Sequence, residues 1–300
     1  MPPSTELGGS FTPAGTSLAL NRIGYGAIKL TGPMAWGPPL DRQAAVAVVR
    51  EAVRLGINHI DTSDYYGPYI ANEIIREALH PYPHGLTIVT KVGARRGADK
   101  SWPQALSKQE LTDAVHDNLR HLGLDVLDVV NLRVGGQFGP SDKSIAEPLS
   151  VLAQLQAQGL IRHIGLSNVS AGQLAEGERI AKVVCVQNRY NLAHRLDDDL
   201  IDNLAGKSVA FVPFFPLGGF QPLQSPILDR AAAALGATTR QVALAWLLNR
   251  APNILIIAGT CSVDHLRENL KAATLRLPPE IVDRLDQIAA TVKEKPSSRQ

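Results

Sequence analysis

Apolar residues along the chain form short runs that alternate with longer amphipathic stretches. The runs have the length of buried strands, and the stretches repeat their apolar positions with the period of a helix. The pattern predicts eight strands, over residues 22–28, 57–60, 86–91, 126–132, 161–166, 183–187, 208–214 and 254–258.

Helices are predicted between and after these strands. Several begin at a capping residue, such as Asp41 or Ser107, and several end at a glycine, such as Gly56, Gly123 or Gly159. The predicted helices cover residues 41–55, 70–79, 107–121, 144–158, 170–181, 197–205, 238–249 and 262–271.

This alternation indicates an α/β fold. A helix between successive strands requires parallel pairing, and eight such units close into a barrel. At 45% hydrophobic content, 300 residues can bury one large core. We therefore expect residues 1–300 to form a single (β/α)8 TIM barrel domain. A short N-terminal hairpin should cover the floor, and an extra helix near 279–290 should pack beside the barrel.

Three long connections, residues 29–40, 92–106 and 215–229, follow strands and should lie on the rim that holds active sites in such barrels. They contain Trp36, Trp102 and Phe220, which are candidate substrate contacts. These aromatic side chains can either wall a pocket or anchor the loops onto the barrel.

Charge and cysteine content exclude several classes of protein. The net charge is +2 and the basic residues are scattered, which does not indicate a nucleic acid partner. Cys185 and Cys261 form neither a disulfide framework nor a metal motif, so no metal and a reducing compartment are expected. Apolar runs are far shorter than the ~18 residues of a spanning helix. We expect a cytoplasmic protein with no membrane partner, and the sequence leaves its oligomeric state open.

The strongest chemical signal lies at two successive strand ends. Asp61 ends one predicted strand, Tyr66 follows five residues later, and Lys91 ends the next strand. In a parallel barrel these positions converge on one rim. The lysine charge should favour tyrosinate and lower the tyrosine pKa from about 10, which would tune a proton donor. The alternative is a helix cap, a loop aromatic and a surface cation.

The run Asp61-Thr62-Ser63-Asp64-Tyr65-Tyr66-Gly67 resembles the Asp-Thr-Ala-x-x-Tyr-Gly signature of the aldo-keto reductases. The resemblance implies that Asp61, Tyr66 and Lys91 are catalytic and that the cofactor is a nicotinamide nucleotide. A Gly-x-Gly-x-x-Gly run after a first strand, which a Rossmann fold would need, is absent from the sequence.

Further motifs resemble the cofactor site of that family. Gly165-Leu166-Ser167-Asn168 and Gln187 are similar to its carboxamide-binding residues, which implies that Ser167, Asn168 and Gln187 bind nicotinamide. Phe214 should stack on the ring, and Phe215 replaces the usual serine. The main-chain amides of Pro216, Leu217 and Gly218 are expected to meet the pyrophosphate.

The segment 259–269 is similar to the adenosine-phosphate grip of the family. The resemblance implies that Glu268 and Asn269 meet adenine. A helix N-terminus favours anions, so Thr260, Ser262 and Arg267 indicate a 2′-phosphate and NADPH rather than NADH. His265, also counted as a cofactor residue, stands where many relatives have arginine.

Arg133 departs from the family pattern, because it occupies the position of the usual histidine on the fourth strand. With Val-Val-Asn-Leu-Arg and Phe-Phe-Pro-Leu-Gly-Gly-Phe it resembles the pyridoxal reductase branch. The resemblance implies reduction of pyridoxal, a small-molecule aldehyde, to pyridoxine. Arg133 could then read the aldehyde oxygen and the neighbouring phenolic oxygen together. Alternatively, it forms a salt bridge with Asp142 or Glu147.

Three other functions stay open at this level. The chain could be a broad NADPH-dependent aldehyde reductase for which pyridoxal is incidental. It could be a nicotinamide-binding redox sensor without useful turnover. It could also be a Schiff-base lyase that uses Lys91, although the nicotinamide motifs would then have no role.

Overall fold

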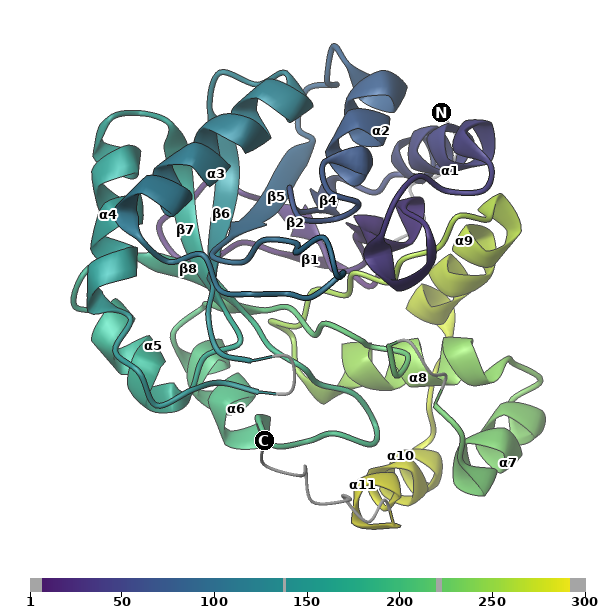
Figure 1. Ribbon diagram of the computed structural model, residues 1–300. Coiled ribbons are helices and arrows are strands. Elements are labelled where there is room, and N and C mark those ends of the chain that lie inside the picture. The colour runs from purple at the N-terminus through teal and green to yellow at the C-terminus, as the bar shows by residue number, and fades with distance from the viewer. Residues whose placement is uncertain (1–6, 137–138, 220–222, 292–300) are drawn as a thin grey trace.

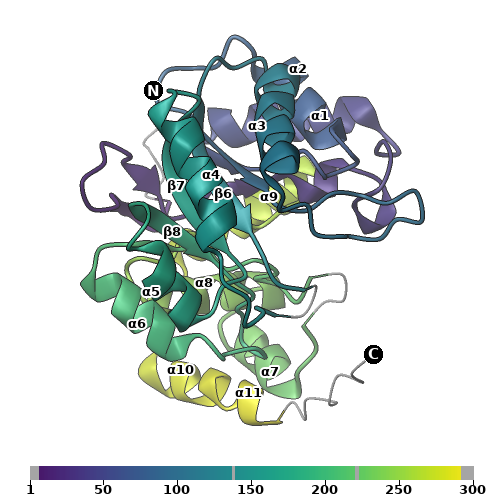
Figure 2. The same cartoon turned by 60° about the vertical axis from the view of Figure 1, so that its left-hand side comes forward.

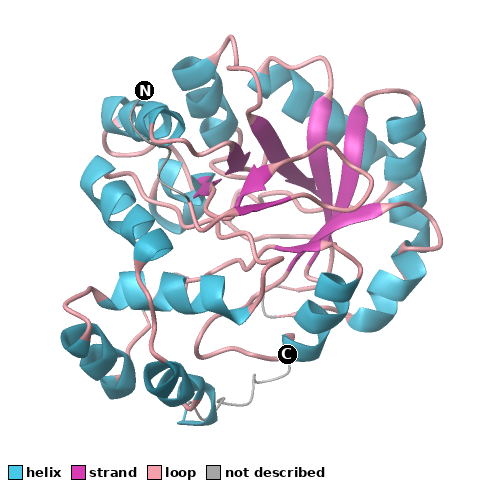
Figure 3. Ribbon diagram, turned by 180° about the vertical axis from the view of Figure 1, so that it is seen from behind, coloured by secondary structure: helices cyan, strands magenta, loops and turns pink. Residues whose placement is uncertain are grey.

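The computed structural model describes residues 7–136, 139–219 and 223–291 of the chain. A ring of strands occupies the centre, and helices surround it in chain order, so that α9 lies beside α1 (Figure 1). From behind, the strands are seen to twist around a common centre inside the helices (Figure 3). Within the described ranges, no helix is both long and apolar enough to cross a bilayer.

Seven parallel strands form one sheet in the order β3 to β9, so strands that follow each other in sequence are also neighbours in space. They are β3 (Tyr25–Gly26), β4 (His59–Asp61), β5 (Thr87–Val92), β6 (Leu127–Arg133), β7 (Ile161–Ser167), β8 (Val183–Gln187) and β9 (Ala210–Phe211).

The eighth predicted strand, residues 254–258, forms isolated parallel bridges instead of a regular strand. Ile254 bridges to Phe211 of β9, and Ile256 bridges to Ile23, just before β3. The main chain of Ile256 also forms two hydrogen bonds of 2.8 Å with the residues on either side of Ile23. The segment therefore lies between the two edges of the sheet and closes the barrel, as predicted.

Helices cover the outside of the barrel. They are α1 (Arg42–Arg54), α2 (Ile70–Leu79), α3 (Lys108–Leu122), α4 (Ala146–Ala157), α5 (Ala171–Gly177), α6 (Asp198–Gly206), α7 (Pro226–Ala234), α8 (Thr239–Arg250) and α9 (Val263–Leu270), with short 3-10 segments η1 (Ala27–Leu30), η2 (Pro33–Ala35) and η3 (Lys271–Thr274). The predicted caps are confirmed at α1 and α3. The Asp41 carboxylate accepts from the Ala44 amide at 2.9 Å, and Ser107 forms a capping box with Glu110.

The prediction for the segment before and within α7 was wrong. The sequence pattern predicts a loop over 215–229, whereas the structure begins α7 at Pro226. The Ser225 hydroxyl caps it by accepting from the Ile227 amide at 3.2 Å. A cap followed by proline at the first helical position is a start signal, and the alanine-rich run that follows has high helix propensity.

The C-terminal helix is confirmed, in two pieces. Helices α10 (Pro279–Asp286) and α11 (Ile288–Thr291) lie outside the barrel below α6 and α7 (Figure 2). Asp286 fixes them, because its carboxylate accepts from Trp246 Nε1 at 2.9 Å and from Arg195 Nη1 at 2.7 Å.

The N-terminal hairpin, β1 (Ser10–Phe11) with β2 (Leu20–Asn21), is antiparallel. The Asn21 amide donates to Asn58 Oδ1, just before β4, and the Ala14 amide donates to Ser208 O, just before β9, both at 2.9 Å. The hairpin therefore covers the amino ends of the strands. This arrangement leaves the carboxyl ends, where the candidate chemistry lies, as the accessible rim.

Candidate active site

An ion pair between Asp61 and Lys91 lies inside the barrel at this rim. Lys91 Nζ is 2.6 Å from Asp61 Oδ1, and each side chain is 4% exposed. Lys91 Nζ also donates to Thr62 O at 2.9 Å, and Gln187 Nε2 donates to Asp61 Oδ2 at 2.7 Å. A buried pair needs such extra hydrogen bonds to offset the loss of hydration. Strands β4, β5 and β8 thus converge on one polar cluster.

Tyr66 lies beside this ion pair, with Lys91 Nζ 5.0 Å from the centroid of its ring. A bridge between Trp36 and Gly67 holds the turn that carries it. Gly67 has a φ of +113°, and a Cβ there would come within 2.5 Å of Ile70 Cβ. Glycine is therefore needed for the turn that presents Tyr66.

The pKa of Tyr66 differs in direction from our prediction. Burial raises this pKa most, the Asp61 carboxylate raises it further, and the Arg133 guanidinium opposes them. The Lys91 charge lies against Asp61 at 2.6 Å, so little of it is left to stabilise a tyrosinate. Tyr66 therefore stays a neutral phenol, which is the protonation state of a proton donor.

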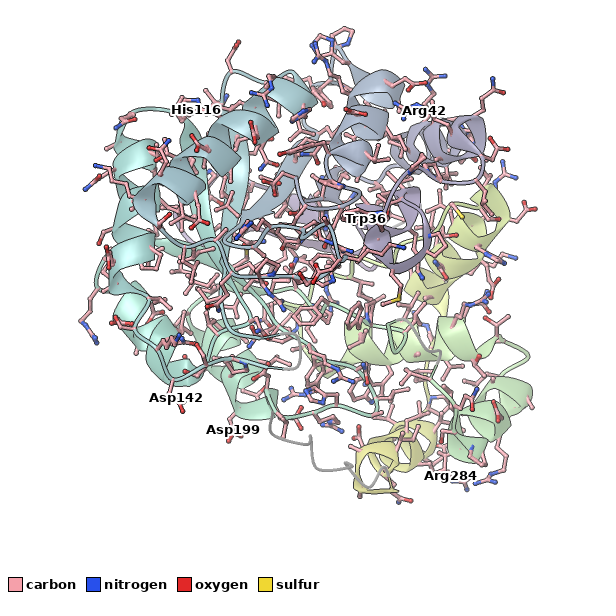
Figure 4. All side chains as sticks on the ribbon, in the orientation of Figure 1. Trp36, Arg42, His116, Asp142, Asp199 and Arg284 are labelled. Atoms are coloured by element: carbon pink, nitrogen blue, oxygen red, sulfur yellow. The ribbon has the colours of Figure 1, made fainter. Side chains whose placement is uncertain are left out.

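Arg133 ends β6 and faces the same site. Its guanidinium carbon is 5.0 Å from the centroid of the Phe214 ring, and Nη2 donates to Gly136 O at 3.2 Å. Burial lowers its pKa, and the nearby phenols of Tyr65 and Tyr66 oppose this. Asp142, one of the ion-pair partners considered above, lies at the edge of the molecule (Figure 4). The contacts of Arg133 thus favour a role at the site.

A cavity of about 1010 Å³ extends from this cluster across the rim. Asp61, Tyr66 and Gln187 line one end, and Thr260, Cys261, His265, Glu268 and Asn269 also line it. Both sets thus face one continuous space, which has room for an extended ligand with a reactive group and a distant recognition group.

Several buried polar atoms near this cluster have no hydrogen-bond partner among the described residues, among them Asn131 Nδ2 on the register neighbour of Lys91. Two others are Ser167 Oγ and Gln187 Oε1, on residues that are register neighbours in β7 and β8. A buried polar atom without a partner is costly, so these two atoms fit a missing polar ligand such as a carboxamide. Ser167 and Gln187 are thus placed together, as the resemblance implies.

Asn168 has a different environment. Its Nδ2 lies 2.8–2.9 Å from the carbonyl oxygens of Val134, Gly136 and Gly139. Its own backbone has a φ of +61°, a conformation that asparagine tolerates better than most residues. Its amide nitrogen therefore fixes the loop after β6 and is not available to a ligand.

The turn after β9 forms part of the cavity wall through Phe214, Pro216 and Leu217. The prediction that three main-chain amides of this turn bind a pyrophosphate was wrong for two of them. Proline has no N–H, which removes Pro216, and the Gly218 amide donates to Phe215 O at 3.0 Å. Leu217 remains as the candidate donor of the three.

At the far end, the structure places Thr260, His265, Glu268 and Asn269 on the cavity wall. The Ser262 hydroxyl instead caps α9 by accepting from the His265 amide at 3.4 Å. Arg267, predicted to bind a phosphate, donates to Glu51 Oε1 from Nε at 3.1 Å and from Nη2 at 2.9 Å. The structure therefore does not bring Arg267 to the cavity.

Trp36 and Trp102 anchor loops instead of lining the cavity. The Arg96 guanidinium carbon lies 5.2 Å from the Trp36 ring centroid and 3.8 Å from that of Trp102. Arg96 Nη1 also donates to Met34 O at 3.2 Å. Trp36 lies near the centre of the face in Figure 4. The third predicted aromatic contact, Phe220, lies outside the described residues.

Sequence reasoning missed two arginines of this region. Arg96 lies in the predicted connection 92–106 and Arg240 in the predicted helix 238–249, and neither was given a site role. Arg240 lines the cavity. A basic residue in the first turn of a helix is unfavourable for the helix dipole, and this was the available signal.

Comparisons with known proteins agree with this geometry. Residues 22–290 match the model of the aldo/keto reductase family. The chain is 62% identical over 273 residues to pyridoxine 4-dehydrogenase of Escherichia coli (strain K12), covering 90% of this chain and 96% of that protein.

Solved structures give a similar result. A thermostable aldo-keto reductase in complex with the inhibitor epalrestat matches with a TM-score of 0.79 and 30% identity, over 93% of this chain and 99% of that one. An aldo/keto reductase from Klebsiella pneumoniae in complex with NADP and acetate matches with a TM-score of 0.75 and 26% identity, over 90% and 92% of the two chains.

The stacking of Arg96 predicts a difference between neighbouring arginines. Arg96→Met should lower the free energy of unfolding by about 1–2 kcal/mol, because two cation–π contacts are lost. Arg95→Met is the matched control: Arg95 is 64% exposed and lies 3.8 Å from Glu110, so its loss should cost under about 0.5 kcal/mol. Urea unfolding measures both, and equal costs would contradict the anchoring role.

Proposed function

Because this chain belongs to the aldo/keto reductase family, we propose that it reduces pyridoxal to pyridoxine with NADPH. The observation that carries the proposal is the Asp61–Lys91 pair beside Tyr66, at the end of a long cavity. The substrate is taken from the E. coli relative, whose name describes the same chemistry in the direction of oxidation.

The residues along the cavity fit a nicotinamide dinucleotide. Ser167 Oγ and Gln187 Oε1 are the partnerless polar atoms that a carboxamide would satisfy. Phe214 offers a ring face at the same end, and Asn269 Oδ1 is a further buried atom without a partner at the other end. The bound cofactor would supply a hydride to the carbonyl carbon of the substrate.

The protein supplies the proton. As the carbonyl carbon gains a hydride, its oxygen becomes an alkoxide, a much stronger base than a phenolate. The Tyr66 phenol is neutral and faces the cavity beside Asp61, so it can donate its proton to that oxygen. Lys91 donates to Asp61 and Thr62, which holds the cluster in place around Tyr66. The aldehyde, one hydride and one proton together give the alcohol.

Arg133 selects the substrate. Asp61 and Lys91 cancel in charge, so the Arg133 guanidinium leaves the site net positive. Pyridoxal has a phenolic oxygen next to its aldehyde, and a planar guanidinium can donate two parallel hydrogen bonds to such a pair of oxygens. Two observations support this role: the Arg133 guanidinium carbon is 5.0 Å from the Phe214 ring centroid, and its charge acts on the Tyr66 phenol.

The lyase alternative has less support. A Schiff base needs a free amine lone pair on Lys91. Lys91 Nζ instead donates hydrogen bonds to Asp61 Oδ1 and to Thr62 O, and its ion pair with Asp61 favours the protonated amine, which has no lone pair. The broad aldehyde reductase differs from the proposed pyridoxal reductase only in its choice of substrate. The redox sensor differs from it only in lacking useful turnover.

Tyr66→Phe should lower kcat at least ~10²-fold while NADPH binding persists, because the proton donor is lost and the cavity is kept. Tyr82→Phe is the control: Tyr82 Oη donates to Leu122 O at 2.7 Å, the residue does not line the cavity, and kcat should change less than about threefold. Steady-state rates and fluorescence titration measure both. A Tyr66→Phe enzyme with near-normal kcat would rule out this assignment.

Arg133→Met should reduce kcat/KM for pyridoxal more than for benzaldehyde, which lacks the second oxygen. The differential should be about 1.5–3 kcal/mol if the charged hydrogen bond forms. Arg133→Lys keeps the charge but lacks the planar guanidinium. Its kcat/KM for pyridoxal should therefore lie between those of the unaltered enzyme and of Arg133→Met. If both aldehydes lose the same factor, Arg133 acts on the shared carbonyl and the broad reductase is favoured.

Cys261 reports on cofactor binding. Its thiol is exposed and lines the cavity, whereas Cys185 is buried. Iodoacetamide should therefore modify Cys261 selectively, and saturating NADPH should slow this modification at least about fivefold, since a ligand excludes reagent from the sites it covers. Mass spectrometry of the two cysteine peptides measures the rates. Unchanged labelling of Cys261 under saturating NADPH would contradict the placement of the cofactor.

A further inference from the structure

NADPH differs from NADH by the 2′-phosphate on its adenosine ribose, so a preference for NADPH needs a cation near the adenine end of the cavity. This step rests on the proposed function. Among the described residues that line the cavity, Lys29 and Arg240 are the ones with a permanent positive charge. Arg267, which the sequence favours, is absent from that wall.

Arg267 is held outside by a charge network between α9 and α1. Its guanidinium donates to Glu51 at 2.9 and 3.1 Å and lies 3.9 Å from Asp264. Glu51 also accepts a hydrogen bond from Arg54. This hydrogen bond lowers the pKa of Glu51 most, burial opposes it, and Arg267 lowers the pKa further, to about 2. Glu51 is therefore ionised at any ordinary pH, and it keeps Arg267 engaged.

Arg240 has the opposite arrangement. It lies in the first turn of α8, after the Thr238 cap, and its side chain is 50% exposed. Arg240 Nη1 lies 3.4 Å from Glu268 Oε2, a long contact for a charged hydrogen bond. Since a guanidinium carries five N–H donors, this contact leaves most of them for another acceptor.

The surroundings of Arg240 match an adenosine site. Gln241 Nε2 donates to Glu268 O at 3.2 Å, which ties the start of α8 to α9. Asn269, the next residue of α9, lines the cavity and has a buried Oδ1 without a partner. The Asn269 Oδ1 atom therefore offers a hydrogen-bond acceptor to a polar ligand in the cavity. His265 lies on the same wall.

Lys29 lies elsewhere on the wall. It belongs to η1, after β3, and its Cγ would be 3.6 Å from a Cβ on Gly259. This places it against the turn that follows the closing strand, whereas Arg240 is in contact with Glu268 beside Asn269. The ribose phosphate lies next to adenine, so proximity to these two residues favours Arg240.

We propose that Arg240, and not Arg267, recognises the 2′-phosphate of NADPH and sets the preference of this enzyme for NADPH over NADH. The guanidinium moves from its long contact with Glu268 or shares its donors between Glu268 and the phosphate. Where the guanidinium shares its donors, its charge also offsets the repulsion between Glu268 and the phosphate.

The experiment measures binding of two fragments that lack nicotinamide, 2′-phospho-ADP-ribose and ADP-ribose, by isothermal titration calorimetry. Arg240→Ala should weaken the phosphorylated fragment about tenfold or more, in line with loss of a charged hydrogen bond, and should change ADP-ribose less than about twofold. Arg240→Lys should retain part of the preference, because it keeps the charge. Arg267→Ala is the matched control and should leave both affinities within about twofold.

The outcomes separate the two levels of proposal. If the unaltered protein prefers the phosphorylated fragment and Arg240→Ala keeps that preference, this inference is overturned while the proposed function stands. The same holds if Arg267→Ala or Lys29→Ala abolishes the preference instead. Equal loss of both fragments in Arg240→Ala would show that Arg240 only positions Glu268. If the unaltered protein binds neither fragment, the proposed function itself fails.

Discussion

The buried ion pair between Asp61 and Lys91 is the constraint on which the rest of the active site depends. Removing two charges from water costs several kcal/mol per ion, so the pair is stable only where further hydrogen bonds complete it. Gln187 and the Thr62 carbonyl complete it here, at 2.7 and 2.9 Å. Thr62 follows Asp61 at the end of β4, whereas Lys91 lies in β5 and Gln187 in β8, and the curvature of the barrel brings the carboxyl ends of these strands together.

The same pair decides how Tyr66 can act. Because Lys91 is matched by Asp61, its charge does not acidify the phenol, and burial raises the Tyr66 pKa. In the proposed reaction, proton donation is therefore driven by the basicity of the alkoxide that forms on the substrate, and not by an acidified tyrosine. Arg133 has no carboxylate partner among the described residues, and this is why the proposed function assigns to it the recognition of an anionic substrate oxygen.

Charge pairing has a similar effect at the other end of the cavity. Glu51 binds both Arg54 and Arg267, and so draws the arginine of the expected phosphate motif to the outer surface between α9 and α1. Arg240 reaches the cavity from α8, on a neighbouring helix. The cation on the cavity wall therefore belongs to α8 and not to α9. The geometry of the wall, and not the position of an arginine within a motif, determines which side chain faces the cavity.

The order of strands and helices and the convergence of Asp61, Tyr66 and Lys91 on one rim were predictable from sequence, because each depends on local period or on which residues end parallel strands. The pairing of Ser167 with Gln187 followed from the family resemblance. The irregular closing segment around Ile256, the direction of the Tyr66 pKa and the partners of Asn168, Arg96 and Arg267 were not. Each depends on which group from a distant part of the chain lies within a few ångströms. The sequence alone thus determined the barrel and the residues at its rim. Only the tertiary structure decided which of their charges are neutralised by a neighbour and which remain for a ligand, because that depends on distances between residues far apart in the chain.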